Sequence, residues 1–285
     1  MSLKIIDTHM HFAYNPRFDS LAVDSGHVNQ LVNIQRDMKE IGVVAAVAMA
    51  RAQTTQDGSW PMGALEEYLE GGKRPDNIYV TTGVQPDMIQ KSNIDLLLQR
   101  FEENLRQPET VGMKIYAGYQ KHYVADEVYR PFIELVTKYG LPVIIHTGET
   151  ARAEGLLKYS HPLTIDDAAV QYPDTTFVMA HFGFPFVAEA AEVLRKNPNV
   201  YADLSGILVG RPDLKNLIDG SHGFFAYLKS WIWYCNSPEK FMFATDWPLA
   251  SITTYIDFVR FLFDEQHHEK VFYHNAKNVF RRIKE

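Results

Sequence analysis

The chain has 285 residues, 46% of them hydrophobic, and its 28 basic and 35 acidic residues leave a net charge of −7. A mildly acidic chain without a run of like charges is poorly suited to nucleic acid or an anionic membrane surface, so neither is expected as a partner. The single cysteine, Cys235, excludes an intrachain disulfide and favours a reducing compartment, so we expect a cytoplasmic protein. The longest apolar run, 43–50, is too short to cross a membrane.

Hydrophobic periodicity predicts alternating strands and helices along the chain. Short apolar runs, some of them typical of strands buried on both faces, predict strands at 3–6, 43–49, 78–84, 111–116, 142–146, 176–181, 200–204 and 241–245. Apolar residues at helical spacing predict helices at 28–41, 62–70, 93–105, 125–139, 165–172, 186–196, 224–234, 253–263 and 271–283. An irregular stretch is expected before 220.

Eight strands, each followed by a helical segment, predict an α/β fold with a parallel sheet, and eight such units close into a (β/α)8 TIM barrel. The length fits a single barrel domain over residues 1–285, because such a barrel usually needs roughly 250 residues. A doubly wound open sheet is the alternative, but no glycine-rich turn follows the first strand.

The carboxyl ends of the expected strands carry residues that suit a metal site. They are His9 and His11 after the first strand, Lys114 on the fourth, His146 on the fifth, His181 on the sixth and Asp246 after the eighth. In a parallel barrel these ends face one mouth, where active sites lie. Each residue alone could be structural, but imidazoles and a carboxylate gathered at one rim predict a site for a divalent cation.

The segments around these residues resemble the strand-end motifs of the amidohydrolase superfamily. The closest branch is the amidohydrolase-2 group, which includes lactone and amide hydrolases and several decarboxylases. The motifs are DTHMH, VGMKIY, LPVIIHTG, FVMAHFG, VYADLSG and FATDWP, and KVFYHNAKNVF resembles the closing helix of that group. They span nearly the whole chain and are specific for the superfamily but not for a substrate.

The resemblance implies that His9, His11, His146 and Asp246 hold one divalent cation, with water completing its coordination. Zn²⁺ is the expected metal, and Mn²⁺ or Fe are the alternatives. The resemblance also implies that His181 orients or deprotonates a water beside the metal. Asp246 could accept that proton instead, so the identity of the base stays open.

The loops after the strands are expected to form the substrate pocket. In binuclear relatives a lysine at the position of Lys114 is carbamylated and bridges two metals, but the mononuclear branch is the nearer match, so we expect Lys114 to contact a substrate anion. Arg51, Trp60, Tyr116 and Arg211 also lie on these loops or strand ends. Arginine binds carboxylate with two hydrogen bonds, so a carboxylate-bearing substrate is predicted, with surface salt bridges as the alternative role of both arginines.

The resemblance and the site chemistry together favour a metal-dependent hydrolase. An activated water would attack an ester, lactone or amide of a small substrate. A non-oxidative decarboxylase on the same metal site is the alternative, since it would use the same ligands. A metal kept only for folding is disfavoured, because structural sites are usually closed by four protein ligands. The aromatic helix at 224–234 could mark a homodimer face or belong to the core.

Overall fold

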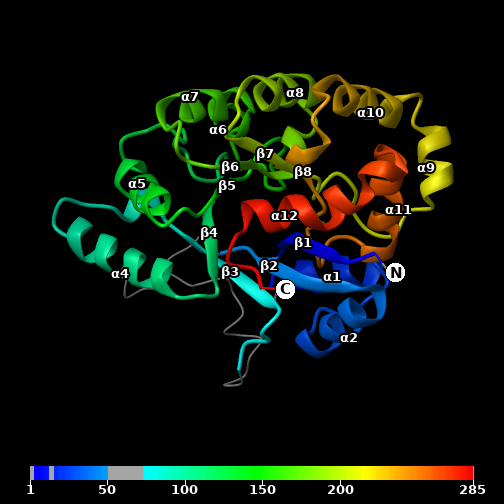
Figure 1. Cartoon of the computed structure of the whole chain (residues 1–285), viewed down its shortest axis with the longest axis horizontal. Helices are drawn as coiled ribbons and strands as arrows, with labels where there is room; N and C mark the ends of the chain where they lie inside the picture. Colours follow the sequence, from blue (N-terminus) through cyan, green and yellow to red (C-terminus); the bar gives the residue numbers. More distant parts are fainter. Residues whose placement is uncertain (1–2, 13–15, 51–72, 285) are drawn as a thin grey trace.

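The computed structural model describes residues 3–12, 16–50 and 73–284 (Figure 1). At its centre is one eight-stranded sheet whose strands pair in chain order, each parallel to the next. The strands are β1 (Ile5–Met10), β2 (Val43–Ala48), β3 (Ile78–Gly83), β4 (Thr110–Ile115), β5 (Val143–Ile145), β6 (Phe177–Met179), β7 (Val200–Asp203) and β8 (Phe241–Met242). The predicted TIM barrel is therefore confirmed.

Hydrogen bonds between β1 and the segment after β8 close the barrel. The backbone N–H of Asp246 donates to the carbonyl of His9 at 2.9 Å, and the N–H of His11 donates to the carbonyl of Trp247 at 2.6 Å. Three of the four residues in these bonds, His9, His11 and Asp246, are among those that the sequence predicts as metal ligands. We call this junction the closing seam.

Helices surround the strands (Figure 1). They are α1 (Pro16–Asp24), α2 (Leu31–Ile41), α4 (Ile94–Arg106), α5 (Arg130–Lys138), α6 (Leu157–Ser160), α7 (Leu163–Gln171), α8 (Val187–Lys196), α9 (Leu214–Gly220), α10 (Phe224–Cys235), α11 (Ile252–Leu262) and α12 (Asn275–Val279). Single turns occur at η1 (Pro86–Met88), η2 (Ala180–Gly183), η3 (Pro238–Lys240), η4 (Glu265–His267) and the π-helical η5 (Lys270–His274). Among the described residues no helix is both long and apolar enough to span a bilayer.

The structure differs from the expected elements in a few places. Helix α1 was not anticipated, and α9 forms inside the stretch expected to be irregular, where the Asp213 carboxylate accepts from the N–H of Asn216 and caps it. Helix α5 begins only at Arg130, next to Pro131, which favours a helix start. The expected helix at 271–283 is split between η5 and α12. The helix expected at 62–70 lies outside the described residues.

Two apolar clusters make up the core. The larger one lies between the strands and the surrounding helices. In the smaller one, strand residues such as Ile6, Val47 and Val178 pack with Phe280 of the C-terminal segment. Figure 1 shows α12 lying across β1 and β8. The apolar end of the barrel is filled in this way, so the polar residues near the ends of the strands are left to form the site.

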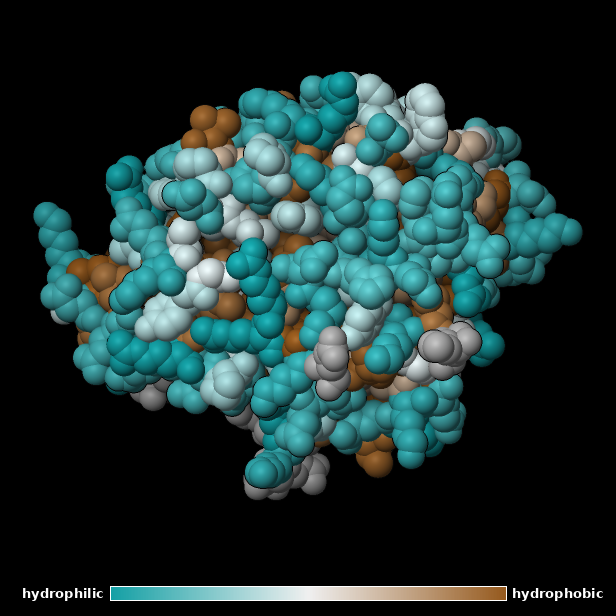
Figure 2. Space-filling model, viewed as in Figure 1, coloured by the Kyte–Doolittle hydropathy of each residue, from teal (hydrophilic) through white to brown (hydrophobic). Residues whose placement is uncertain are grey.

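The aromatic helix α10 is divided between core and surface. Phe225, Leu228 and Ile232 are buried, whereas Trp233 is 79% exposed. Apolar residues are otherwise scattered over a mostly hydrophilic surface in the view of Figure 2. One face of α10 therefore belongs to the core, and a homodimer contact on the other face stays a prediction.

Candidate metal centre

The closing seam brings His9, His11 and Asp246 together. His9 lies inside β1 and is fully buried, and His11 follows just after the strand. Asp246 Oδ1 is 3.0 Å from His11 Nε2 and 3.6 Å from His9 Nε2. These three side chains form one of two groups of described residues whose ligand atoms converge closely enough to hold a metal ion.

The charge states of His9 and Asp246 suit a metal ion. Burial lowers the pKa of His9 to about 3, so its imidazole is neutral and has a lone pair to offer. Burial alone would raise the pKa of Asp246, but His11, then His9 and His181, hold it below its usual range. His9 Nε2 and Asp246 Oδ1 are buried and have no hydrogen-bond partner among the described residues. Such atoms are costly to bury, and a divalent cation would satisfy both.

The backbone of Asp246 adopts an unusual conformation. Its φ is 62°, in the left-handed region that residues other than glycine rarely occupy. The hydrogen bond from its N–H to His9 holds this conformation, and the N–H of Leu249 donates back to the Asp246 carbonyl at 3.0 Å. Strained backbone of this kind tends to persist at functional sites.

His146 and His181 form a pair next to this group. His146 Nδ1 lies 3.1 Å from His181 Nε2, and its Nε2 lies 2.9 Å from the carbonyl of Glu149. The His181 ring is also 5.0 Å from the ring of His9, centroid to centroid. Burial lowers the pKa of both paired histidines. The structure therefore brings His146 to the site, but in contact with His181, and its role as a ligand stays a prediction.

Asp203 and Ser205 were not predicted as site residues, although both lie in the VYADLSG motif. His9, His181 and Asp203 form the second converging group, in which His9 Nδ1 is 2.9 Å from Asp203 Oδ2. Ser205 Oγ lies 2.8 Å from His181 Nδ1. Asp203 and Ser205 are separated by one residue at a strand end, as His9 and His11 are, and that spacing was the available signal.

Asp7, the first residue of the DTHMH motif, belongs to neither converging group. Its Oδ2 accepts the hydroxyl of Thr245 at 2.6 Å, and its Oδ1 accepts the backbone N–H groups of His9 and Thr245, each at 3.2 Å. Burial raises the pKa of this carboxyl to about 7. Asp7 therefore joins the two sides of the closing seam and is occupied by these bonds.

Lys114 is a buried cation beside the site. It is 1% exposed, and its Nζ has no hydrogen-bond partner among the described residues. Burial lowers its pKa to about 8, while Asp203 and Asp246 oppose that shift. Its Nζ lies 5.1 Å from the centre of the Tyr116 ring, and the Tyr116 hydroxyl donates to the carbonyl of Ala50. An unpaired ammonium suits the expected contact with a substrate anion.

Among the described residues, none of the other side chains that were expected to contact the substrate lies in the site. Arg51 and Trp60 lie outside these residues. Arg211 is exposed, and its guanidinium packs against Gly26 after α1. The described structure instead places the Tyr119 ring 5.0 Å from the His146 ring, with the guanidinium of Arg152 5.0 Å from the Tyr119 ring.

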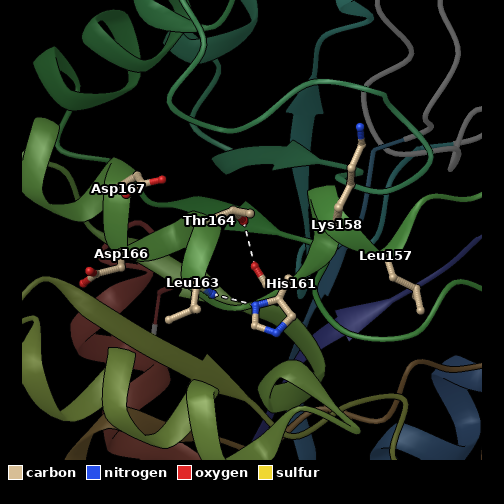
Figure 3. A pocket seen from close by; sticks show the side chains of 7 residues that line it. All are labelled: Leu157, Lys158, His161, Leu163, Thr164, Asp166 and Asp167. Carbon is tan, nitrogen blue, oxygen red and sulfur yellow. Dashed lines mark hydrogen bonds between the residues drawn. The ribbon is translucent and has the colours of Figure 1, made fainter.

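A separate hollow lies on the surface between α6 and α7 (Figure 3). Its lining includes Leu157, Lys158, His161 and Thr164. The Thr164 hydroxyl donates to the carbonyl of His161 at 2.9 Å, and the Lys158 side chain points away from this pair. None of the lining residues belongs to the two converging groups, so we assign no chemistry to this hollow.

Comparisons with known proteins show the family and the fold of the chain. A family model described as amidohydrolase matches residues 6–282. Among curated proteins, the FluG protein of Emericella nidulans is 36% identical over 72 residues, which is 25% of this chain but only 8% of that protein's length.

Solved structures share the fold at low sequence identity. An uncharacterised TIM-barrel protein from Bordetella bronchiseptica is 18% identical with a TM-score of 0.69, covering 99% of both chains. A 5-carboxyvanillate decarboxylase from Sphingomonas paucimobilis is 16% identical with a TM-score of 0.65, covering 98% of this chain and 99% of its own. A probable 2-pyrone-4,6-dicarboxylic acid hydrolase from Acinetobacter baumannii is 15% identical with a TM-score of 0.59, with the same coverage.

Proposed function

The chain belongs to the amidohydrolase family, and we propose that it is a metal-dependent hydrolase of small carboxylate-bearing esters, lactones or amides. The observation that carries this proposal is the convergence of His9, His11 and Asp246 at the closing seam, with bare buried atoms on two of them. These residues, together with His146, would hold one divalent cation, for which Zn²⁺ fits the neutral imidazoles and the carboxylate. When bound, such a cation supplies an acidified water and polarises the carbonyl that is attacked.

His181 is the residue we assign to proton transfer. It is buried and its lowered pKa keeps it neutral, so it can accept a proton at neutral pH. Its Nε2 faces His146 Nδ1 rather than solvent. A proton taken up at Nε2 can be returned to the leaving group when the scissile bond breaks. Asp246 is the alternative acceptor, but its lowered pKa makes it the weaker base.

Lys114 is the residue we assign to substrate binding. Its buried, unpaired ammonium would gain a partner from a substrate carboxylate, which would offset the unfavourable burial of the charge. Tyr116 lies next to it and would form a wall of the pocket. Contacts from Arg51, Trp60 and Arg211 stay predictions.

A decarboxylase that uses the same residues is the second candidate. Lys114 could hold either a carboxylate that remains on the product or one beside the bond that breaks. Two structural neighbours are named for these two reactions, one as a probable hydrolase of a pyrone dicarboxylic acid and the other as a decarboxylase of a carboxylated vanillate. Both names describe carboxylate-bearing substrates, which supports the proposed class. A cytoplasmic location and a single domain also stay predictions.

The test begins with the metal content of the purified chain, measured beside that of the His9→Ala/His11→Ala double variant. We expect about one Zn²⁺ per wild-type chain and none in the double variant. The metal-loaded chain is then screened on lactones, esters and amides of small dicarboxylic acids in H₂¹⁸O. Incorporation of ¹⁸O supports the hydrolase, whereas release of CO₂ without ¹⁸O would favour the decarboxylase.

Two outcomes would overturn parts of the proposal. About two metals per chain, with the mass of one CO₂ added at Lys114, would replace the single site by a binuclear one bridged by a carbamylated lysine. Full hydrolytic activity after complete removal of metal by a chelator would exclude a metal-dependent mechanism.

A further inference from the structure

Asp203 lies at the end of β7 and is saturated with hydrogen bonds. It is fully buried. Its Oδ2 accepts from His9 Nδ1 at 2.9 Å. Its Oδ1 accepts from the backbone N–H of His181 at 3.0 Å, from the N–H of Ser205 at 3.1 Å and from the Ser205 hydroxyl. One carboxylate thus contacts both a proposed metal ligand and the proposed proton acceptor.

The contact with Asp203 determines which nitrogen of His9 carries the proton. Asp203 acts as an acceptor towards its other neighbours, since its Oδ1 accepts the N–H groups of His181 and Ser205, and a carboxylate oxygen in this arrangement accepts from a ring N–H. The proton of the neutral His9 ring must therefore sit on Nδ1. Nε2 is left bare, and it faces Asp246 at 3.6 Å. This is the tautomer that a metal ligand needs at Nε2.

A similar count of protons applies to His181. A serine hydroxyl has a single proton, and Ser205 donates it to Asp203. Ser205 Oγ must then accept from His181 Nδ1, which lies 2.8 Å away. The neutral His181 ring is therefore protonated on Nδ1 and bare on Nε2, the nitrogen to which we assigned the proton transfer.

The same loop holds the His181 backbone. His181 has a φ of 62°, and the hydrogen bond from its N–H to Asp203 helps to hold this left-handed conformation. Gly206 passes close to the ring, because a Cβ at that position would lie 2.5 Å from His181 Nδ1. The segment 203–206 therefore fixes both the position and the tautomer of His181.

We propose that Asp203 and Ser205 act as one positioning unit that sets the tautomers of His9 and His181 together, so that ligand and proton acceptor both present a bare Nε2 to the site. The roles of His9 and His181 in this unit rest on the proposed function, whereas the hydrogen bonds that define the unit do not. Ser205 Oγ also lies 3.2 Å from His9 Nδ1, so the hydroxyl fills the space between the atoms of the second converging group. We therefore assign hydrogen bonding, and not a second metal ion, to that group.

His146 places a further constraint on His181 Nε2. Its Nε2 lies 2.9 Å from the carbonyl of Glu149, which can only accept, so its own proton is on Nε2 and its Nδ1 is bare. Nδ1 then faces the bare Nε2 of His181 at 3.1 Å. Two lone pairs at this distance repel each other unless a cation or a proton lies beside them. The pair is thus set up to receive a positive charge.

The test reads the tautomers directly in the metal-free chain. Imidazole ¹⁵N shifts of the histidine-labelled chain are measured by two-bond ¹H–¹⁵N correlation, with each ring assigned by substitution. We expect His9 and His181 to be protonated on Nδ1. Metal affinity is measured by competition with a chromophoric chelator, and kcat and KM on the metal-loaded chain.

Two variants separate the two halves of the unit. Asp203→Asn can donate from its amide nitrogen, so His9 should lose the Nδ1–H form, and metal affinity should fall roughly 10- to 100-fold. Ser205→Ala should leave the His9 tautomer and metal affinity unchanged, mix the tautomers of His181 and lower kcat about tenfold without raising KM. Asp213→Asn, at the exposed cap of α9, and Ser221→Ala, on the same chain segment, are the matched controls.

The outcomes distinguish this unit from the proposed function. His9 or His181 protonated on Nε2 in the wild-type chain would overturn the unit, as would unchanged metal affinity in a folded Asp203→Asn variant. If Asp203→Asn does not fold, the Ser205→Ala result decides. A second equivalent of metal lost on Asp203→Asn but kept in His11→Ala would make the second group a metal site instead. Expected tautomers in a chain that hydrolyses no substrate would support the unit and refute the hydrolase.

Discussion

The two sides of the candidate site are built in different ways. At the closing seam, His9 Nε2 and Asp246 Oδ1 are buried without hydrogen-bond partners among the described residues. At the ends of β6 and β7, the side chains of His181, Asp203 and Ser205 are joined to one another by hydrogen bonds. Unpaired buried atoms leave a place for a ligand, whereas a fully paired network holds side chains in one geometry. We infer that the closing seam is the binding side, which takes up the ligand, and that the ends of β6 and β7 are the positioning side, which holds the catalytic side chains in place.

The largest effect is expected from Asp246→Asn, which removes the carboxylate from the binding side. Metal should be lost, and kcat/KM should fall on the order of a thousandfold, because a bound cation contributes several kcal/mol to the transition state. The measurements are metal content and steady-state kinetics, with Asp213→Asn as the control at an exposed carboxylate. A variant that keeps both its metal and its rate would show that the seam is not the binding side.

His181→Asn tests the positioning side. We expect kcat to fall about a hundredfold while metal content stays at the wild-type level, since general-base catalysis typically contributes at least this much. His161→Asn, near the surface hollow, serves as the control. If His181→Asn loses its metal as well, the division into two sides is wrong.

Lys114→Met is expected to separate stability from substrate binding. The folded chain holds the Lys114 ammonium unfavourably, since burial lowers its pKa from 10.5 to about 8. This penalty is present in full below pH 8 and is relieved as the pH rises towards 10.5. At pH 7 the variant should therefore be more stable, by up to about 3 kcal/mol, while KM for an anionic substrate rises.

Denaturant unfolding at several pH values checks this prediction. The stability difference between Lys114→Met and the wild type should shrink steadily above pH 8. A variant that is less stable than the wild type at pH 7 would mean that Lys114 has a partner in the folded chain.

The smallest effect is expected from Gly206→Ala. The new Cβ would approach His181 Nδ1 to 2.5 Å, and the φ of Gly206 is +66°, so both the ring and the backbone must shift. We expect kcat to fall roughly tenfold and stability to fall by about 1–2 kcal/mol, with metal affinity unchanged. Gly220→Ala, where a Cβ would meet nothing within 4 Å, is the control. Equal kinetics for the two variants would exclude contact with His181.

The sequence predicts the barrel well because its pattern is local. Alternating apolar runs and amphipathic segments depend only on neighbouring residues, and parallel strands bring all their ends to one mouth. This is why His9, His11, His146, His181 and Asp246 could be assigned to one region. Helix α1 was not predicted, and its packing leaves little apolar pattern to detect, because only one of its residues, Ala22, is buried.

The pairings inside the site could not be predicted in the same way. His9 and Asp203 form a hydrogen bond although they lie 194 positions apart, and no local sequence pattern predicts which carboxylate will bond to a histidine ring. Asp7 lies two positions before His9, yet its side chain accepts a hydrogen bond from the Thr245 hydroxyl across the closing seam. The regular pairing of β1 with β2 is interrupted between Asp7 and Met10. The partners and directions of these hydrogen bonds depend on how the strands are placed in space. The roles of Asp203 and Ser205 could therefore be inferred only from the structure.

The closing seam also has a consequence for how the chain matures in the cell. The Thr245 hydroxyl donates to Asp7 across 238 positions, so β1 must wait for the segment after β8 to be synthesised before the barrel can close. A cation that needs His9 and Asp246 together cannot be captured by a half-made chain. Loading of the proposed cation would then follow closure of the barrel, and because the cation would bind only the completed barrel, a free metal concentration 100 times Kd would add about 2.7 kcal/mol of stability. Cellular metal supply would therefore set how long the finished enzyme survives turnover.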